Sequence, residues 1–273
     1  MAEFNLESYL IFWPGVVALI SLSAASALLG IFLSLRKMSL AGDAISHSLL
    51  PGIAIAYAFK GLETGWLSVG AFISGSLAIT ILVFLNRGRK HASDAHMALL
   101  YLTFLSTGIL ILTAHPSRVD ILDLLFGNLL ALDSHSLLWI LPFCALLILA
   151  TIIKSRSLWL TATDPEWAQY LRKSLTKNEF WFLFSLNLCL VLAFQVAGTL
   201  LSLGLLLFPV MTIRQWSSHL STLFIGSVLF GIANSIIGLF LCFYLNTPAG
   251  PSVVLASAIM YFMNLQISRR FAK

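Results

Sequence analysis

An aspartate and a histidine, Asp43 and His47, stand four residues apart in a stretch that is otherwise apolar or small. On an α-helix this spacing places both side chains on one face, one turn from each other. A carboxylate oxygen and an imidazole nitrogen suit a divalent transition metal, although two ligands are too few for a tight site. A charge inside a hydrophobic segment is costly and points to function. Asp43 and His47 are therefore candidate metal ligands.

The competing interpretation of the same pair is structural. An aspartate before an apolar run is a common helix N-cap, and Asp43 precedes such a run. In this interpretation His47 is hydrogen-bonded to the backbone. The residue types alone leave both interpretations open. The two roles are also compatible, because a site that must release its ion binds it weakly.

The composition requires a membrane environment for the elements that carry this pair. The chain has 273 residues, of which 59% are hydrophobic and 10% are charged, and its mean hydropathy is +0.95. A soluble domain has about 25% charged residues. The charge-free blocks are long and lack the alternating pattern of an outer-membrane barrel. We predict an all-α polytopic membrane protein, folded as a single transmembrane domain over residues 1–273.

About eight or nine hydrophobic helical segments are expected, two of them short. Ala44–Phe59 is short for a span, so its helix is expected to begin in a protein-lined region. Glycines and Pro209 interrupt Phe180–Ile213, which predicts a full helix followed by a short one. Asn246–Pro251 must divide the last apolar block. The blocks are Ser8–Leu35, Ala44–Phe59, Thr64–Asn86, Met97–Ala114, Ser134–Ile153, Phe180–Ile213 and Gln215–Ser268.

Positive charge predicts the orientation of these segments. With the N-terminus outside, only Lys60 and Arg118 fall on the outer side. The C-terminal Arg269 and Arg270 are then cytoplasmic. The cytoplasmic side also receives Arg36, Lys37, Arg87, Arg89, Lys90, Lys154, Arg156, Arg172, Lys173, Lys177, Arg214 and Lys273.

The order of several motifs resembles that of a known family. Residues 35–52, LRKMSLAGDAISHSLLPG, closely resemble the signature of the ABC-3 permeases of bacterial zinc, manganese and iron importers. Residues 125–131 (LFGNLLA), 196–201 (VAGTLL), 206–209 (LLFP) and 248–255 (PAGPSVVL) resemble further family segments in the same order. The resemblance covers nearly the whole chain.

This resemblance implies a function and a set of partners. It implies a homodimeric permease in the bacterial inner membrane that works with two cytoplasmic P-loop ATPase subunits and an extracytoplasmic metal-binding protein. In the family the motif's aspartate and histidine are proposed to line the metal path, and they fall on Asp43 and His47. The chain has no GxxxxGK[ST] phosphate loop, so ATP hydrolysis is expected on a separate chain. The cargo is expected to be manganese, zinc or iron, with no permanently bound cofactor.

A polar segment between two apolar blocks is the candidate contact with the ATPase. Thr212, Ile213, Arg214, Gln215 and Trp216 match the family position of the coupling helix. The alternative is an ordinary interfacial turn with an aromatic anchor. The segment from Asp164 to Lys173, where a helix is expected to start at Thr163–Glu166, is the rival contact.

The remaining histidines and aspartates are weaker metal candidates. A solvated loop or a docking surface explains them better than direct ligation, and His219 is expected at a helix end. Those near the predicted inner face are His91, Asp94 and His96, and those near the outer face are His115, Asp120, Asp123 and His135.

Two other functions remain open at this stage. One is an ABC permease for a metal chelate such as a siderophore, and the other is a membrane scaffold or sensor that transports nothing. A transport assay with metal-loaded binding protein distinguishes a metal permease from a chelate permease. Stimulation of the partner ATPase by the binding protein distinguishes a transporter from a scaffold or sensor.

Overall fold

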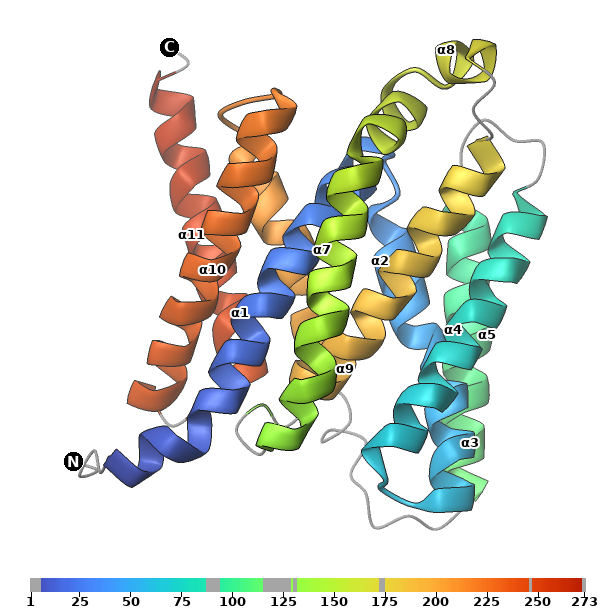
Figure 1. Ribbon diagram of the computed structural model, residues 1–273, viewed down its shortest axis with the longest axis vertical. Coiled ribbons are helices and arrows are strands. Elements are labelled where there is room, and N and C mark those ends of the chain that lie inside the picture. Colours follow the sequence, from blue (N-terminus) through green and yellow to red (C-terminus); the bar gives the residue numbers. More distant parts are fainter. Residues whose placement is uncertain are drawn as a thin grey trace. The chain divides into compact units, whose positions relative to one another are not determined.

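The computed structural model describes residues 6–86, 94–114, 129, 132–171, 175–245 and 247–271. These ranges contain helices and no strand, which confirms the all-α prediction. The helices in Figure 1 are α1 (Leu6–Leu35), α2 (Ser39–Ser48), α3 (Leu50–Lys60), α4 (Thr64–Leu85), α5 (Asp94–Ala114), α7 (Ser134–Thr163), α8 (Pro165–Tyr170), α9 (Leu175–Ile213), α10 (Leu220–Leu245) and α11 (Ala249–Phe271).

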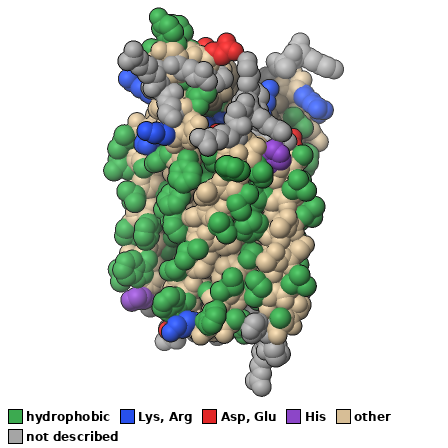
Figure 2. Space-filling model, turned by 90° about the vertical axis from the view of Figure 1, so that its right-hand side faces the viewer, with side chains coloured by type: hydrophobic (Ala, Val, Ile, Leu, Met, Phe, Trp, Pro, Cys, Tyr) green, Lys and Arg blue, Asp and Glu red, His purple; other side chains and the backbone are tan. Residues whose placement is uncertain are grey.

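Within the described ranges, seven helical segments are long and apolar enough to cross a membrane. They belong to α1, α4, α5, α7, α9, α10 and α11. Large apolar side chains such as Ile73, Leu77 and Phe84 of α4 are more than half exposed. Figure 2 shows hydrophobic side chains over much of the visible face, with the Lys and Arg side chains away from its middle. The chain is therefore a multi-pass membrane protein, because only lipid accommodates this much exposed apolar surface.

The described residues group into two compact units by their internal contacts. The first unit comprises residues 1–31, 122–149 and 196–273. The second unit comprises residues 32–121 and 150–195, and it contains α2, α3, α4 and α5. The single transmembrane domain over residues 1–273 stays a prediction.

The second unit packs the two short helices α2 and α3 against α4 and α5. A Cβ atom built on Gly52 of α3 would collide with the Gly70 carbonyl of α4, and one on Gly70 would collide with the Gly52 carbonyl. Small residues let membrane helices approach this closely, so these glycines fix the α3–α4 contact. Asn187 of α9 joins this packing, because its side-chain amide donates to the Phe72 carbonyl at 3.2 Å.

Two helix breaks occur in the described chain, and the sequence predicts only the second, because it treats Ala44–Phe59 as one apolar segment that the structure divides at Leu49. Pro51, the second residue of α3, lacks an N–H and lies just after the interruption at Leu49 that separates α2 from α3. In α9, Gly198 has φ 74° and ψ 178°, a conformation that is essentially limited to glycine. The segment Leu175–Val196 is span-length and Leu201–Ile213 is shorter. The predicted full helix followed by a short one is confirmed.

The first unit contains the end of the chain. Its helices α10 and α11 pack together, and Gly238 lies so close to Val253 that a side chain there would collide with the Val253 backbone. The tight contact falls near the α10–α11 connection, where the sequence predicts a break. The two helices end and begin at Leu245 and Ala249, which confirms that division.

The fifth predicted span ends later than expected. The apolar block closes at Ile153, but α7 continues to Thr163 through Lys154 and Arg156. Hydropathy marks where a helix leaves lipid, whereas the helix itself ends where α8 begins. There Asp164 Oδ1 accepts a hydrogen bond from the Trp167 amide at 2.9 Å, so the predicted helix start at this point is confirmed.

Candidate metal site

Asp43 lies inside α2 and does not cap it. The helix begins at Ser39, with Met38 in the N-cap position and no side-chain cap bond. Asp43 is therefore the fifth helical residue, too far along to satisfy the free amides of the first turn. The proposed N-cap role of Asp43 is wrong, because the helix starts earlier than the apolar run suggests. His47 lies in the last turn of the same helix.

The face of α2 that carries the pair differs from the rest of the helix. Ala41, Gly42, Ala44 and Ile45 are buried. The Asp43 side chain is 43% exposed and the His47 side chain is 19% exposed. The small and apolar residues thus hold α2 in the packing of the second unit and leave the polar pair partly exposed.

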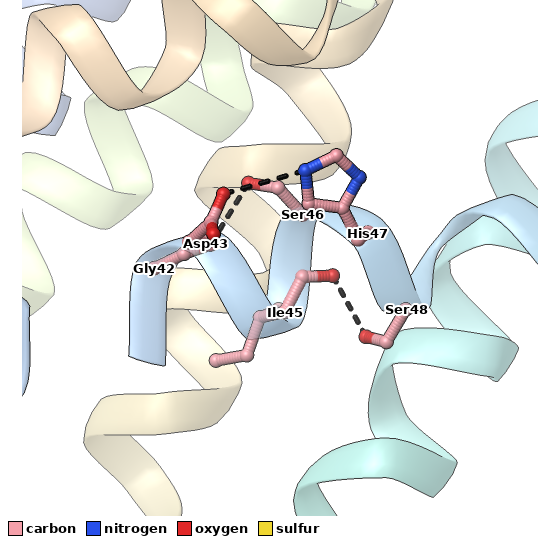
Figure 3. A network of polar contacts seen from close by, with 6 residues as sticks. All are labelled: Gly42, Asp43, Ile45, Ser46, His47 and Ser48. Atoms are coloured by element: carbon pink, nitrogen blue, oxygen red, sulfur yellow. Dashed lines mark hydrogen bonds and ion pairs between the residues drawn. The ribbon is translucent and has the colours of Figure 1, made fainter. Parts of the chain in front are cut away.

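The two side chains meet as the four-residue spacing predicts. His47 Nε2 lies 3.3 Å from Asp43 Oδ1 (Figure 3). A strong hydrogen bond between a charged nitrogen donor and a carboxylate is shorter, about 2.7–2.9 Å. Two ligands held about 2.0–2.2 Å from one tetrahedral zinc ion are about 3.4 Å apart. The separation therefore fits two ligands of one metal ion better than a tight ion pair.

The other nitrogen of His47 has a different environment. Nδ1 is buried and has no hydrogen-bond partner among the described residues. The ring of Tyr101 from α5 meets the imidazole edge to face, with 4.8 Å between the ring centres. Metal-binding histidines usually donate this second N–H to a fixed acceptor. The missing acceptor favours a weakly held ion.

The described part of the chain brings no third ligand to the pair. No group of three or more His, Cys, Asp or Glu side chains that could hold a metal occurs in it. Asp43 and His47 thus have no third His, Cys, Asp or Glu beside them in the described ranges, and their role as metal ligands stays a prediction. A bound ion would complete its coordination with water, with residues of a second copy, or with residues outside the described ranges.

The other candidate residues lie apart from the pair or serve helix ends. His96 Nδ1 is 2.8 Å from Asn86 Oδ1, and Asp94 and His135 are exposed. The His219 carbonyl accepts from the Leu223 amide at the start of α10, which confirms its helix-end position. The predicted candidates His91, His115, Asp120 and Asp123 and most of residues 125–131 lie outside the described residues.

Sequence reasoning missed a serine that holds the end of α2. Ser74 of α4 donates to the Ser48 carbonyl at 2.6 Å, and both residues are buried. The Ser48 carbonyl lies at the α2–α3 interruption, one residue after His47. A hydrogen bond at this point fixes the last turn of α2, and with it the direction of the imidazole. Only the Pro-containing break, which frees backbone groups, hints at such a partner in the sequence.

The predicted coupling segment forms the end of α9 and a turn. Thr212 and Ile213 are the last helical residues, and the amides of Gln215 and Trp216 bond back to their carbonyls at 3.2 and 3.0 Å. Arg214, Gln215 and Trp216 thus form a turn that follows α9, and the coupling role of the segment stays a prediction. Arg214 is exposed and the Trp216 side chain is 49% exposed.

The rival segment does contain a helix, α8. Its Trp167 and Tyr170 are exposed, and their rings stack with centres 5.4 Å apart. Arg172 and Lys173 of the same segment lie outside the described residues. Both segments thus present aromatic side chains outside the packing of their own unit.

The fold is that of a polytopic helical membrane protein whose helix α2 carries the Asp43–His47 pair. The sequence matches the ABC 3 transport family over residues 8–268, and the chain belongs to that family. The resemblance found in the motifs is confirmed.

Individual relatives narrow the class further. The chain is 32% identical over 254 residues to the manganese import system permease protein ScaB of Streptococcus gordonii, covering 93% of this chain and 90% of ScaB. It is 27% identical to a protein of Haemophilus influenzae named "Probable iron transport system membrane protein", covering 90% and 86%. The solved structure of PsaBC from Streptococcus pneumoniae in complex with Fab matches with a TM-score of 0.82 at 28% identity, covering 95% and 92%.

Proposed function

We propose that this chain is the membrane permease of an ABC importer that moves a divalent transition metal, manganese, zinc or iron, into the cell. Membership of the ABC 3 transport family and the relatives named for manganese and iron transport support this function. The permease is a homodimer in the bacterial inner membrane with its N-terminus outside. Two cytoplasmic ATPase subunits and an extracytoplasmic binding protein complete the importer.

Asp43 and His47 act as transient ligands on the metal path. The observation that carries this assignment is their 3.3 Å separation on a partly exposed face of α2. A carboxylate and an imidazole attract a divalent cation, and a set of only two ligands releases it readily. The carboxylate compensates the cation's lost hydration, and the imidazole adds selectivity for transition metals over calcium and magnesium.

ATP-driven closure of the partner subunits would change access to this pair. We assign the contact with the ATPase to Thr212, Ile213, Arg214, Gln215 and Trp216, because Arg214 and Trp216 are exposed at the end of a helix that is broken at Gly198. A rigid segment after a break transmits a push as a whole. The segment around α8 stays the rival contact, since it exposes Trp167 and Tyr170.

Metal uptake by the reconstituted importer tests the assignment. The chain with its ATPase and binding protein is placed in proteoliposomes, and uptake of Mn²⁺, Zn²⁺ and Fe²⁺ is measured in parallel. Replacing Asp43 and His47 by alanine together should abolish uptake while the complex still assembles. The matched control is Ser39→Ala with Ser46→Ala on the same helix, which should transport normally.

The same experiment tests the alternative cargo, a metal chelate such as a siderophore. Binding protein loaded with a ferric siderophore replaces the metal-loaded one in a further arm. Uptake of the chelate but not of the free metals would replace the proposed function. Undiminished metal uptake by the Asp43/His47 double variant would refute the site while leaving the class of transporter in place.

A further inference from the structure

A hollow on the surface of the second unit is lined by residue types that metal transport does not require. It has a volume of about 500 Å³ and lies between α4, α7 and the first half of α9. Its polar lining is Lys154, Thr176 and Lys177, and its apolar lining is Val83, Phe180, Trp181 and Phe184. Two ammonium groups at a hollow with three aromatic rings suit a ligand that is anionic at one end and apolar at the other.

The apolar wall of the hollow is continuous. Phe180 and Phe184 are four residues apart on one face of α9, and their rings stack with centres 6.1 Å apart. Phe184 also meets Phe72 of α4 edge to face at 5.1 Å. Both Phe180 and Phe184 remain exposed to the surroundings of the helix. This wall is long enough to cover the first carbons of an acyl chain.

The charged rim of the hollow is ordered by contacts between α7 and α9. Lys154 Nζ of α7 lies 4.4 Å from the centre of the Trp181 ring of α9. One turn beyond, the Asn178 side-chain amide donates to the Ser157 hydroxyl at 3.0 Å. These contacts join α7 and α9 without any ligand, so the hollow is formed in advance. The nearby carboxylate of Glu179 interacts with Arg36, which limits its influence on the two lysines.

The level of the hollow along the helices identifies its ligand. Lys154 follows the apolar block of α7, and Lys177 precedes the apolar part of α9. Both lysines therefore lie where the helices leave the hydrocarbon, on the predicted cytoplasmic side. Tryptophan and lysine side chains are typical of this interface, and the cytoplasmic leaflet carries anionic lipids.

We propose that this hollow binds an anionic phospholipid. Its phosphate is held by Lys154 and Lys177, with the Thr176 hydroxyl as a further donor, and its acyl chain lies on Phe180 and Phe184. The two lysines attract an anionic group. The direction of the apolar wall favours the lipid over the ATPase as occupant, because the wall continues toward the middle of α4 and α9 rather than toward the cytoplasm.

A second lysine–tryptophan pair in the same unit provides the control. Lys60 Nζ lies 5.3 Å from the centre of the Trp66 ring, at the connection between α3 and α4. This pair has the same side-chain chemistry as Lys154 and Trp181 but does not line the hollow. It sits at the predicted outer end of its helices. Replacing Lys60 thus removes an equal charge without touching the proposed site.

Lipid binding to the full-length chain tests the proposal. The delipidated chain in mild detergent is titrated with phosphatidylglycerol, and with phosphatidylcholine of the same acyl chains, and bound lipid is counted by native mass spectrometry. Each lysine near a phosphate contributes about fivefold in affinity, so phosphatidylglycerol should bind about 25-fold more tightly than phosphatidylcholine. Lys154→Gln and, independently, Lys177→Gln should each weaken phosphatidylglycerol about fivefold, whereas Lys60→Gln should not change it.

Three results would overturn the proposal. Equal affinity for the two lipids, or an equal effect of Lys154→Gln and Lys60→Gln, would show that the hollow does not select the anionic headgroup. Displacement of phosphatidylglycerol by an equal concentration of inorganic phosphate would identify a plain anion site. Loss of bound lipid when the ATPase subunit is added would assign the hollow to that partner.

Discussion

Three aspartates of the described chain occupy two contrasting kinds of position. Asp133 and Asp164 directly precede α7 and α8, and their carboxylates accept hydrogen bonds from the amides of Ser136 and Trp167, each at 2.9 Å. Asp43 lies in the fifth position of α2 and bonds to no backbone amide in the described structure. Its carboxylate instead lies 3.3 Å from the imidazole of His47.

This difference distinguishes aspartates that stabilise the fold from an aspartate that serves function. The caps at α7 and α8 satisfy amides that the helix leaves open, so the fold itself explains those two aspartates. Aspartate inside a helix is less favourable than alanine by several tenths of a kcal/mol, roughly 0.6 kcal/mol. The fold therefore gains nothing from the Asp43 carboxylate. Its value lies in what the carboxylate and the imidazole of His47 can bind together.

The largest expected effect comes from removing the carboxylate at each kind of position, in the variants Asp43→Ala and Asp133→Ala. Asp43→Ala should lower metal uptake about 100-fold or more, since even the loss of a residue that merely supports a metal ligand costs 10–100-fold. It should leave thermal unfolding of the purified chain unchanged or slightly raised. Asp133→Ala should do the reverse, with normal uptake and a lower unfolding temperature. Uptake is measured in proteoliposomes and unfolding by circular dichroism. A destabilised Asp43→Ala protein with normal uptake would remove the contrast.

A smaller effect is expected at the residue that holds the end of α2. Ser74→Ala leaves the buried Ser48 carbonyl without its 2.6 Å donor, which should cost about 1 kcal/mol of unfolding free energy. Metal uptake should fall less than in Asp43→Ala, because the ligands remain. Thr80→Ala is the control, since the Thr80 hydroxyl bonds to Ser76 of its own helix. Equal stability of the two variants would show that the Ser74 bond does not hold the junction.

The smallest effect is the pH dependence of the Asp133 cap. Hydrogen bonds from the Ser136 hydroxyl and amide lower the pKa of Asp133 below its usual value. Because the folded state has the lower pKa, the cap's contribution is complete above about pH 4, the usual pKa of an unfolded aspartate. It is lost as the pH falls through the lowered pKa. The stability difference between the native chain and Asp133→Ala should therefore be constant at neutral pH and shrink in acid. A difference that grows in acid would contradict this assignment.

Much of the architecture could be predicted because it depends on local properties of the sequence. The apolar blocks predicted the long helices, Gly198 predicted the break in α9, and Asp164 predicted the start of α8. The four-residue spacing of Asp43 and His47 gave their contact. Each of these signals acts within about one helical turn, where sequence distance and spatial distance agree.

The contacts between distant residues could not be predicted in the same way. Arg36 is an example: the charge pattern assigns it to topology, but its guanidinium donates to the Thr161 hydroxyl at 3.0 Å and lies 5.0 Å from the Phe182 ring. Burial lowers the pKa of this guanidinium, and the Glu179 carboxylate opposes the shift. The partners come from α7 and α9, more than a hundred residues away along the chain. The same holds for Ser74 at the end of α2.

The helix ends were predicted least well. Hydropathy placed the end of α7 ten residues too early, because Lys154 and Arg156 continue a helix beyond its apolar part. It also placed the start of α2 too late, which suggested a cap role for Asp43. A polar residue stops the membrane span without stopping the helix, so only capping residues such as Asp164 mark the true ends.

The position of the ion in a cargo-loaded complex tests the central claim most directly. Cryo-electron microscopy of the importer with Zn²⁺ should show a density peak that lies about 2.0–2.2 Å from both His47 Nε2 and Asp43 Oδ1. That peak should disappear in the Asp43→Ala, His47→Ala double variant. A cargo ion bound elsewhere on the path, with Asp43 and His47 still 3.3 Å apart and without density between them, would contradict the account.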